Sequence, residues 1–122
     1  MDRDIKLSQA DYRLLSMIWD AEPVTSPELC KRAEDKLGWK RTTTYTVLKR
    51  LCDKGFARNE NIIVTSLWSQ EQVRHLESHQ VLDNSFDGSL PQFIAAFLGD
   101  KKINDREAEE LIHLIDQFRE GK

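Results

Sequence analysis

Helix-start and helix-stop signals divide the first 68 residues into a short series of elements, and their order restricts the fold more than any other feature. Ser8 and Ser26 stand where N-caps are expected, and Pro27 suits the first helical position after Ser26. Gly38 and Gly55 each follow an apolar periodic segment, as residues that end helices commonly do. These signals predict helices over residues 8–20, 26–37 and 42–54, followed by strands over residues 56–58 and 62–68.

Three helices followed by a β-hairpin are the elements of a winged helix-turn-helix domain. Residues 59–61, Asn-Glu-Asn, suit the tight turn of the hairpin, because asparagine tolerates positive φ. We therefore predict a mainly α protein with a small β-hairpin, in which residues 1–69 form a winged-helix domain. The third helix is the expected recognition helix.

The second half, residues 70–122, is predicted to be a separate helical dimerisation domain. Periodicity predicts helices over residues 69–82, 90–98 and 105–119, separated by turns or loops over residues 84–89 and 99–104. A segment of about 50 residues buries strongly apolar helix faces poorly by itself, so we expect a second copy of the chain to cover them. Extension of a single core is the alternative. The residues expected at the homodimer interface are Phe93, Ile94, Phe97, Leu111, Ile112, Ile115 and Phe118.

The net charge of −3 conceals an uneven distribution of charge along the chain. Residues 1–58 carry 12 Lys and Arg against 9 Asp and Glu, whereas residues 59–122 carry 6 against 12. Seven cations and one anion lie between Lys36 and Arg58. Such a local cluster is expected where a protein contacts phosphate, so double-stranded DNA is the predicted partner of the first half.

Two cations, Lys40 and Arg41, stand just before the predicted third helix, and its first turns contain four threonines. β-branched residues are mediocre helix formers, so this run indicates a role other than helix stability. Threonine hydroxyls can bond phosphates or base edges, and threonine methyls can pack on the thymine methyl. A solvated cationic helix face is the alternative interpretation. The residues predicted to contact DNA are Thr25, Ser26, Lys40, Arg41, Thr42, Thr43, Tyr45, Thr46, Lys49, Arg50 and Arg58.

No pattern in the sequence predicts an enzyme, a metal site, a cofactor or a membrane segment. His75 and His79 are four residues apart with Glu71 nearby, but surface histidines of this kind are far more often solvated than metal-bound. Cys30 and Cys52 belong to no metal pattern and are expected to be reduced. No nucleophile stands beside a base. The absence of a secretory signal and of an apolar run of about 20 residues predicts a cytoplasmic protein.

Several motifs, taken together in their order and spacing, are similar to those of the penicillinase-repressor family of bacterial regulators. They span Leu7 to Trp19, Val24 to Glu28, Gly38 to Lys40 with the threonine-rich run, Leu51 to Phe56, Phe86 to Leu90, and Asp105 to Leu111. The resemblance covers nearly the whole chain. It implies a homodimer that places its third helix in the major groove of a dyad-symmetric operator, dimerises through its C-terminal helices, and represses a β-lactam-resistance or metal-homeostasis operon.

The resemblance also implies modes of induction, from which this sequence departs. In the β-lactam branch a membrane sensor-protease signals, and the repressor is cut between Asn and Phe in the helix that matches residues 90–98. The matching pair here is Ala96-Phe97, which leaves proteolysis and another inducing step both open. The four-cysteine cluster of the copper-responsive branch is absent, and the hairpin turn is short, with Arg58 as its main cation. We predict a repressor of a β-lactamase operon. The alternatives are a winged-helix module that binds protein and a repressor of a metal-homeostasis operon.

Overall fold

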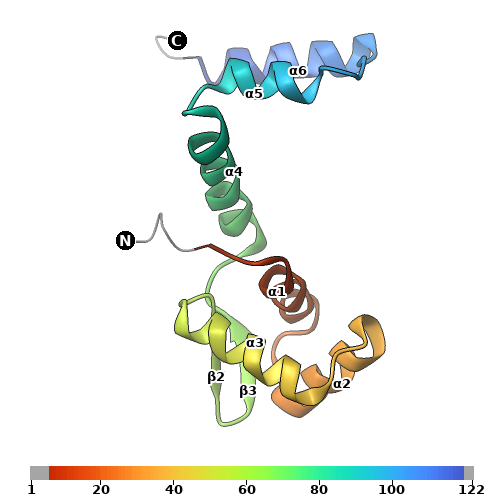
Figure 1. Cartoon of the computed structure of the whole chain (residues 1–122), viewed down its shortest axis with the longest axis vertical. Coiled ribbons are helices and arrows are strands. Elements are labelled where there is room, and N and C mark those ends of the chain that lie inside the picture. Colours follow the sequence, from red (N-terminus) through yellow and green to blue (C-terminus); the bar gives the residue numbers. More distant parts are fainter. Residues whose placement is uncertain (1–5, 120–122) are drawn as a thin grey trace. The chain divides into compact units, whose positions relative to one another are not determined.

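The computed structural model describes residues 6–119, and the chain divides between residues 80 and 81 into two compact units (Figure 1). Its elements are α1 (Gln9–Ala21), β1 (Val24–Thr25), α2 (Ser26–Leu37), α3 (Arg41–Asp53), β2 (Ala57–Glu60), β3 (Ile63–Ser66), α4 (Gln70–Phe86), α5 (Leu90–Phe97) and α6 (Asp105–Gln117). Three helices followed by an antiparallel hairpin confirm the predicted winged helix. α4 contributes residues to both units.

The caps of the first two helices arise from local sequence. At the start of α1, the Ser8 hydroxyl accepts a hydrogen bond from the backbone of Asp11, and the Asp11 carboxylate accepts one from the backbone of Ser8. The prediction of Ser26 as the N-cap of α2 is wrong by one residue. Thr25 occupies the cap, because it has extended backbone geometry and its Oγ1 accepts from the Glu28 N–H at 3.2 Å.

The sheet has a third strand that the sequence analysis missed. β1 pairs antiparallel with β3, and the strand order is β1-β3-β2. β1 has only two residues, too few for any alternation of side chains to be visible in the sequence. The hairpin turn also differs from the prediction of residues 59–61: Glu60 pairs with Ile63, so the turn consists of Asn61 and Ile62, both with positive φ.

A single apolar core holds the first unit together. It takes buried side chains from all three helices, the strands and the start of α4: Leu14, Leu15, Ile18, Leu29, Ala33, Val47, Leu48, Leu51, Phe56, Val64 and Val73. The Trp19 indole N–H donates to the Trp68 carbonyl at 2.9 Å, which joins α1 to the segment after β3. α3 therefore packs against a core to which the other two helices, the strands and the start of α4 all contribute.

The second unit is helical but has little interior. α4 continues to Phe86, beyond the predicted end at residue 82, and the chain turns at Asp87 and Gly88, which have positive φ. The rings of Phe86 and Phe93 meet edge to face with centroids 5.4 Å apart. Among the described residues of α5 and α6, none is buried.

Candidate nucleic-acid interface

α3 presents one face to the core and the opposite face to solvent. Thr44, Val47, Leu48 and Leu51 are buried against the rest of the domain. The exposed side carries Thr42, Thr43, Thr46 and Lys49, with Lys40 and Arg41 at its beginning. The packing of the apolar stripe therefore fixes which residues α3 offers to a partner, and those residues are hydroxyls and cations.

The first turn of α3 keeps its backbone N–H groups available. Lys40 is the N-cap residue, and in the part of the chain that the structure describes its side chain makes no capping hydrogen bond. Unsatisfied N–H groups at a helix N-terminus attract anions such as phosphate. The adjacent cations Lys40 and Arg41 add positive charge at the same place, so the start of α3 is suited to the backbone of a nucleic acid.

A chain of contacts orients Arg41. Its guanidinium lies over the Tyr45 ring, 5.6 Å from the centroid. The Tyr45 hydroxyl donates to Ser26 Oγ at 3.5 Å, which connects α3 to the start of α2. Ser26 is only 3% exposed, so its side chain supports Tyr45 from within instead of lying on the predicted DNA-binding surface.

The threonine hydroxyls of α3 fall into two groups. Thr44 and Thr46 donate to backbone carbonyls one turn earlier, those of Lys40 and Thr42, at 3.4 and 2.9 Å. Within residues 6–119, the hydroxyls of Thr42 and Thr43 have no hydrogen-bond partner. Thr42 and Thr43 can therefore donate to or accept from a ligand, whereas Thr46, whose hydrogen is used, offers its methyl group and the two lone pairs of its oxygen.

Carboxylates neutralise part of the cationic cluster. Lys49 pairs with Asp53 at 3.1 Å, and Arg58, on β2, pairs with Glu60 at 3.8 Å. Both pairs are exposed and hold their cations weakly. The Thr25 hydroxyl, also predicted to contact DNA, already accepts the capping hydrogen bond of α2.

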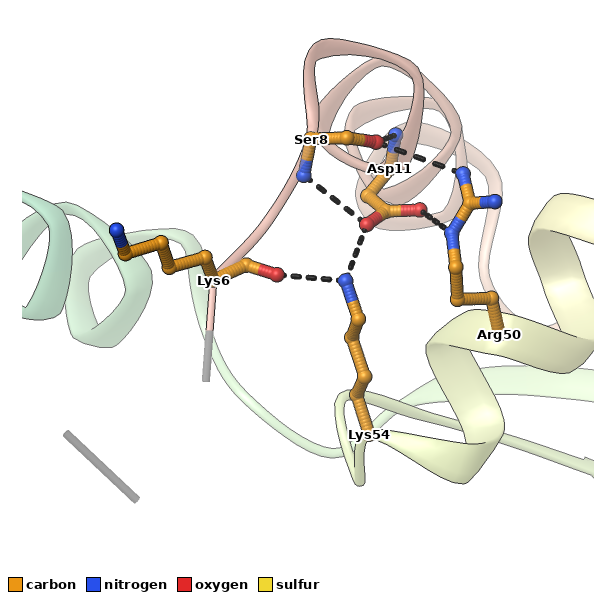
Figure 2. Close-up of polar contacts among 5 residues, drawn as sticks. All are labelled: Lys6, Ser8, Asp11, Arg50 and Lys54. Atoms are coloured by element: carbon orange, nitrogen blue, oxygen red, sulfur yellow. Dashed lines mark hydrogen bonds and ion pairs between the residues drawn. The ribbon is translucent and has the colours of Figure 1, made fainter. Parts of the chain in front are cut away.

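Asp11 is the acidic residue of this region that the sequence analysis did not connect with α3. Figure 2 shows its carboxylate between Arg50 and Lys54, whose Nε and Nζ atoms donate to Oδ1 and Oδ2, each at 2.7 Å. Burial opposes ionisation of this group, but hydrogen bonds from Lys54, Ser8 and Arg50 outweigh it and hold the pKa of Asp11 below its ordinary value. Asp11 belongs to the capping box of α1, which is local, whereas its partners Arg50 and Lys54 lie 39 and 43 residues away.

The second unit exposes the apolar faces predicted for dimerisation. α5 and α6 border an open cavity of about 450 Å³, lined by Phe93, Ile94, Phe97, Leu98, Ile103, Leu111 and Leu114, with Glu107 and Glu110 at the same cavity. Phe97, Ile112, Ile115 and Phe118 are between 57% and 79% exposed. Large apolar side chains gathered in this way mark an interaction surface. Ala96 and Phe97, the predicted cleavage pair, lie exposed on α5.

Neither a metal cluster nor a membrane-spanning helix is found within residues 6–119. The His75 and His79 rings lie edge to face at 4.6 Å, but no group of three or more His, Cys, Asp or Glu side chains in these residues could hold a metal ion. None of the described helices is both long enough and apolar enough to cross a membrane.

Comparison with known proteins relates almost the whole chain to one family. The sequence model of the family described as penicillinase repressor matches residues 7–117. The penicillinase repressor of Bacillus licheniformis is 22% identical over 121 residues, which cover 96% of this chain and 94% of that protein. The penicillinase repressor of Staphylococcus aureus is 19% identical over 121 residues, which cover 96% of each chain. This chain therefore belongs to the penicillinase repressor family, a family of transcriptional regulators.

Proposed function

We propose that this protein is a transcriptional repressor that binds a dyad-symmetric DNA operator as a homodimer. Residues 1–69 bind DNA and residues 70–122 dimerise. The observation that carries the proposal is the exposed face of α3, where Lys40, Arg41 and the unpartnered hydroxyls of Thr42 and Thr43 lie beside uncapped backbone N–H groups. The groups described on this face form no catalytic arrangement, whereas each of them can bind a phosphate or the edge of a base.

The groups of this face divide into backbone contacts and base contacts. Lys40 and the first N–H groups of α3 bind phosphate, while Arg41, held over Tyr45, can reach guanine. Thr42 and Thr43 contact base edges, and the Thr46 methyl packs on thymine. The residues proposed to contact flanking phosphates are Thr25, Lys49, Arg50 and Arg58. Ser26 has no direct contact in this proposal, because it is buried.

The apolar faces of α5 and α6 support the homodimer. An isologous dimer presents two copies of α3 related by a two-fold axis, so its operator is an inverted repeat. The half-sites are then expected one turn of DNA apart, about 34 Å, or a multiple of that distance.

The names of the two relatives support a penicillinase gene, that is a β-lactamase gene, as the target. Deletion of the repressor gene should raise β-lactamase transcript levels, and the purified protein should protect the promoter of that gene in a footprint. Protection of an unrelated promoter alone, with β-lactamase transcripts unchanged, would refute this target.

Release from DNA is proposed to follow cleavage between Ala96 and Phe97 by a membrane sensor-protease. Both residues are exposed, but they lie at the end of the helical segment α5, so the backbone must open locally before it is cut. Protein recovered from β-lactam-treated cells should contain a fragment that begins at Phe97. An intact chain in fully derepressed cells would instead require another inducing step.

A salt series on operator DNA tests the central proposal. Affinity should fall steeply as salt rises, because phosphate contacts release counterions. The double variant Arg41→Ala/Thr43→Ala should lose operator binding and remain a dimer. Arg106→Ala, which removes the same charge from α6, is the matched control and should bind normally. Normal operator binding by the double variant would show that α3 does not bind DNA.

A further inference from the structure

We propose that Asp11 is a positioning residue for DNA binding, which holds Arg50 so that the outer edge of its guanidinium binds a DNA phosphate beside α3. The inference rests on the proposed function, because it adds a supporting residue to the same DNA-binding surface. It assigns to the N-terminal end of α1 a role in recognition that the capping pattern alone does not suggest.

The Asp11 carboxylate is fully buried, and both of its oxygens are occupied. Oδ1 accepts from Arg50 Nε at 2.7 Å, and Oδ2 accepts from Lys54 Nζ at 2.7 Å and from the Ser8 N–H at 3.0 Å. Because the Asp11 carboxylate is buried and accepts from two cations, its ion pairs are held more firmly than the exposed Lys49–Asp53 pair of α3. Asp11 therefore fixes the C-terminal half of α3 against α1.

The two cations of this cluster differ in what they leave free. Lys54 is 27% exposed, and its ammonium also donates to the Lys6 carbonyl at 2.6 Å, so two of its three protons are used inside the protein. Arg50 is 41% exposed. Its Nε donates to Asp11 and its Nη2 to Ser8 Oγ, at 2.7 and 3.4 Å. In Figure 2 the third guanidinium nitrogen points away from both acceptors, and it has no partner among residues 6–119.

The charge balance of the cluster also favours a ligand on Arg50. One cation is enough to compensate the buried carboxylate of Asp11, and Lys54 is more enclosed than Arg50. Arg50 then supplies a surplus positive charge. It stands seven residues after Thr43, two helical turns along the same side of α3, where the proposed DNA-contacting surface continues. A guanidinium with one edge held by carboxylate and another edge open is preorganised for phosphate.

The direction in which one substitution changes the affinity for DNA distinguishes a positioning role of Asp11 from a simple effect of its charge. Removal of an acidic group near DNA is expected to strengthen binding, because it removes repulsion of phosphate. If Asp11 positions Arg50, Asp11→Asn should instead weaken binding, because the guanidinium becomes mobile. The exposed Lys49–Asp53 pair offers a matched control: Asp53→Asn should bind as tightly as the unaltered protein or more tightly.

The experiment measures the affinity of the full-length dimer for operator DNA at several salt concentrations, at a temperature where circular dichroism shows each variant folded. Arg50→Ala should weaken binding by the dimer about 100-fold, because each protomer loses one charged hydrogen bond that contributes about tenfold. The plot of log affinity against log salt concentration should also become less steep, its negative slope decreasing in magnitude by about 1 for each protomer. Asp11→Asn should do the same, and Asp11→Asn/Arg50→Ala should be no worse than Arg50→Ala, because the two residues act as one unit.

A second variant keeps the test decisive if Asp11→Asn does not fold. Arg50→Lys keeps the charge but cannot bind Asp11 and phosphate through separate edges, so its affinity should also fall; unchanged affinity would mean that only charge matters at this position. Equal or tighter binding by Asp11→Asn, with an unchanged salt slope, would overturn the positioning role and leave the proposed function intact. Failure of the unaltered protein to bind any operator in a salt-dependent way would overturn both.

Discussion

Ile112→Asp should convert the proposed dimer to monomers at concentrations where we expect the unaltered protein to be dimeric. Ile112 is 62% exposed on α6 and belongs to the apolar face proposed to meet the partner. Full burial of an isoleucine contributes about 1.5–3 kcal/mol, so covering the exposed part contributes about 1–2 kcal/mol. By symmetry the substitution removes this contribution twice, about 2–4 kcal/mol in all, and raises the dimer dissociation constant about 30- to 1,000-fold. Burial of the new carboxylates adds to that loss.

Analytical ultracentrifugation over a concentration series measures the effect directly. His113→Asp is the matched control, because it places the same charge on the same helix about 100° from Ile112, on the side with the acidic residues. The control should remain dimeric and bind operator normally. Equal dissociation constants for Ile112→Asp and His113→Asp would refute the assignment of this face to the dimer interface. A monomeric Ile112→Asp with undiminished operator affinity would refute the link between dimerisation and DNA binding.

Single substitutions at Asp11, Gly38 and Ser66 test the stability of the first unit. Because the pKa of Asp11 is lowered in the folded protein, its ionised form stabilises the fold at neutral pH. In urea at pH 7, Asp11→Asn should therefore have a lower free energy of unfolding than the unaltered protein. The difference between the two proteins should shrink below about pH 4, as the carboxyl group becomes protonated. A difference that does not shrink at all as the pH falls from about 5 to about 2 would indicate packing instead of charge. Gly38 has φ +69° with open space around it, so Gly38→Ala should cost about 1 kcal/mol from backbone strain alone, measured by thermal unfolding against Ala10→Gly as a propensity control. Ser66→Ala removes the hydroxyl that donates to Glu22 at 2.9 Å and should lower the melting temperature by a few degrees, whereas no change would mean that the backbone N–H of Ser66 satisfies Glu22 unaided.

The sequence predicted those elements whose signals are local. The capping box at Ser8, the left-handed Gly38 and the proline after Ser26 each act within one helical turn, and each helix of the first unit begins or ends within a residue or two of its predicted limit. The end of α4 was missed because Asn84 and Ser85 have turn-forming composition but precede an apolar residue, Phe86, that packs on Phe93. Packing of that kind is not visible in local composition.

Long-range pairing accounts for the other differences. The strand β1 exists only because Val24 finds Val64 on β3, forty positions later in the chain. The count of cations between residues 36 and 58 predicted a strongly positive surface, but it could not include Asp11, which the fold brings to Arg50 and Lys54. Ser26 is a similar case, because its hydroxyl accepts a hydrogen bond from Tyr45 of another helix. The surface of α3 was thus predictable from helical periodicity, whereas the residues that hold it in place were not.

The position of β3 in the middle of the sheet has a consequence for solubility. Both edges of β3 are occupied, by β1 and by β2, so its apolar residues offer no free backbone to another chain. The outer edge of β2 is short, and its exposed residues Arg58, Asn59 and Glu60 are polar or charged. Short charged edges discourage strand-to-strand aggregation. If α5 and α6 form the proposed dimer interface, their apolar faces are exposed until two chains meet, and the short polar edge of β2 then disfavours sheet extension as a competing form of association.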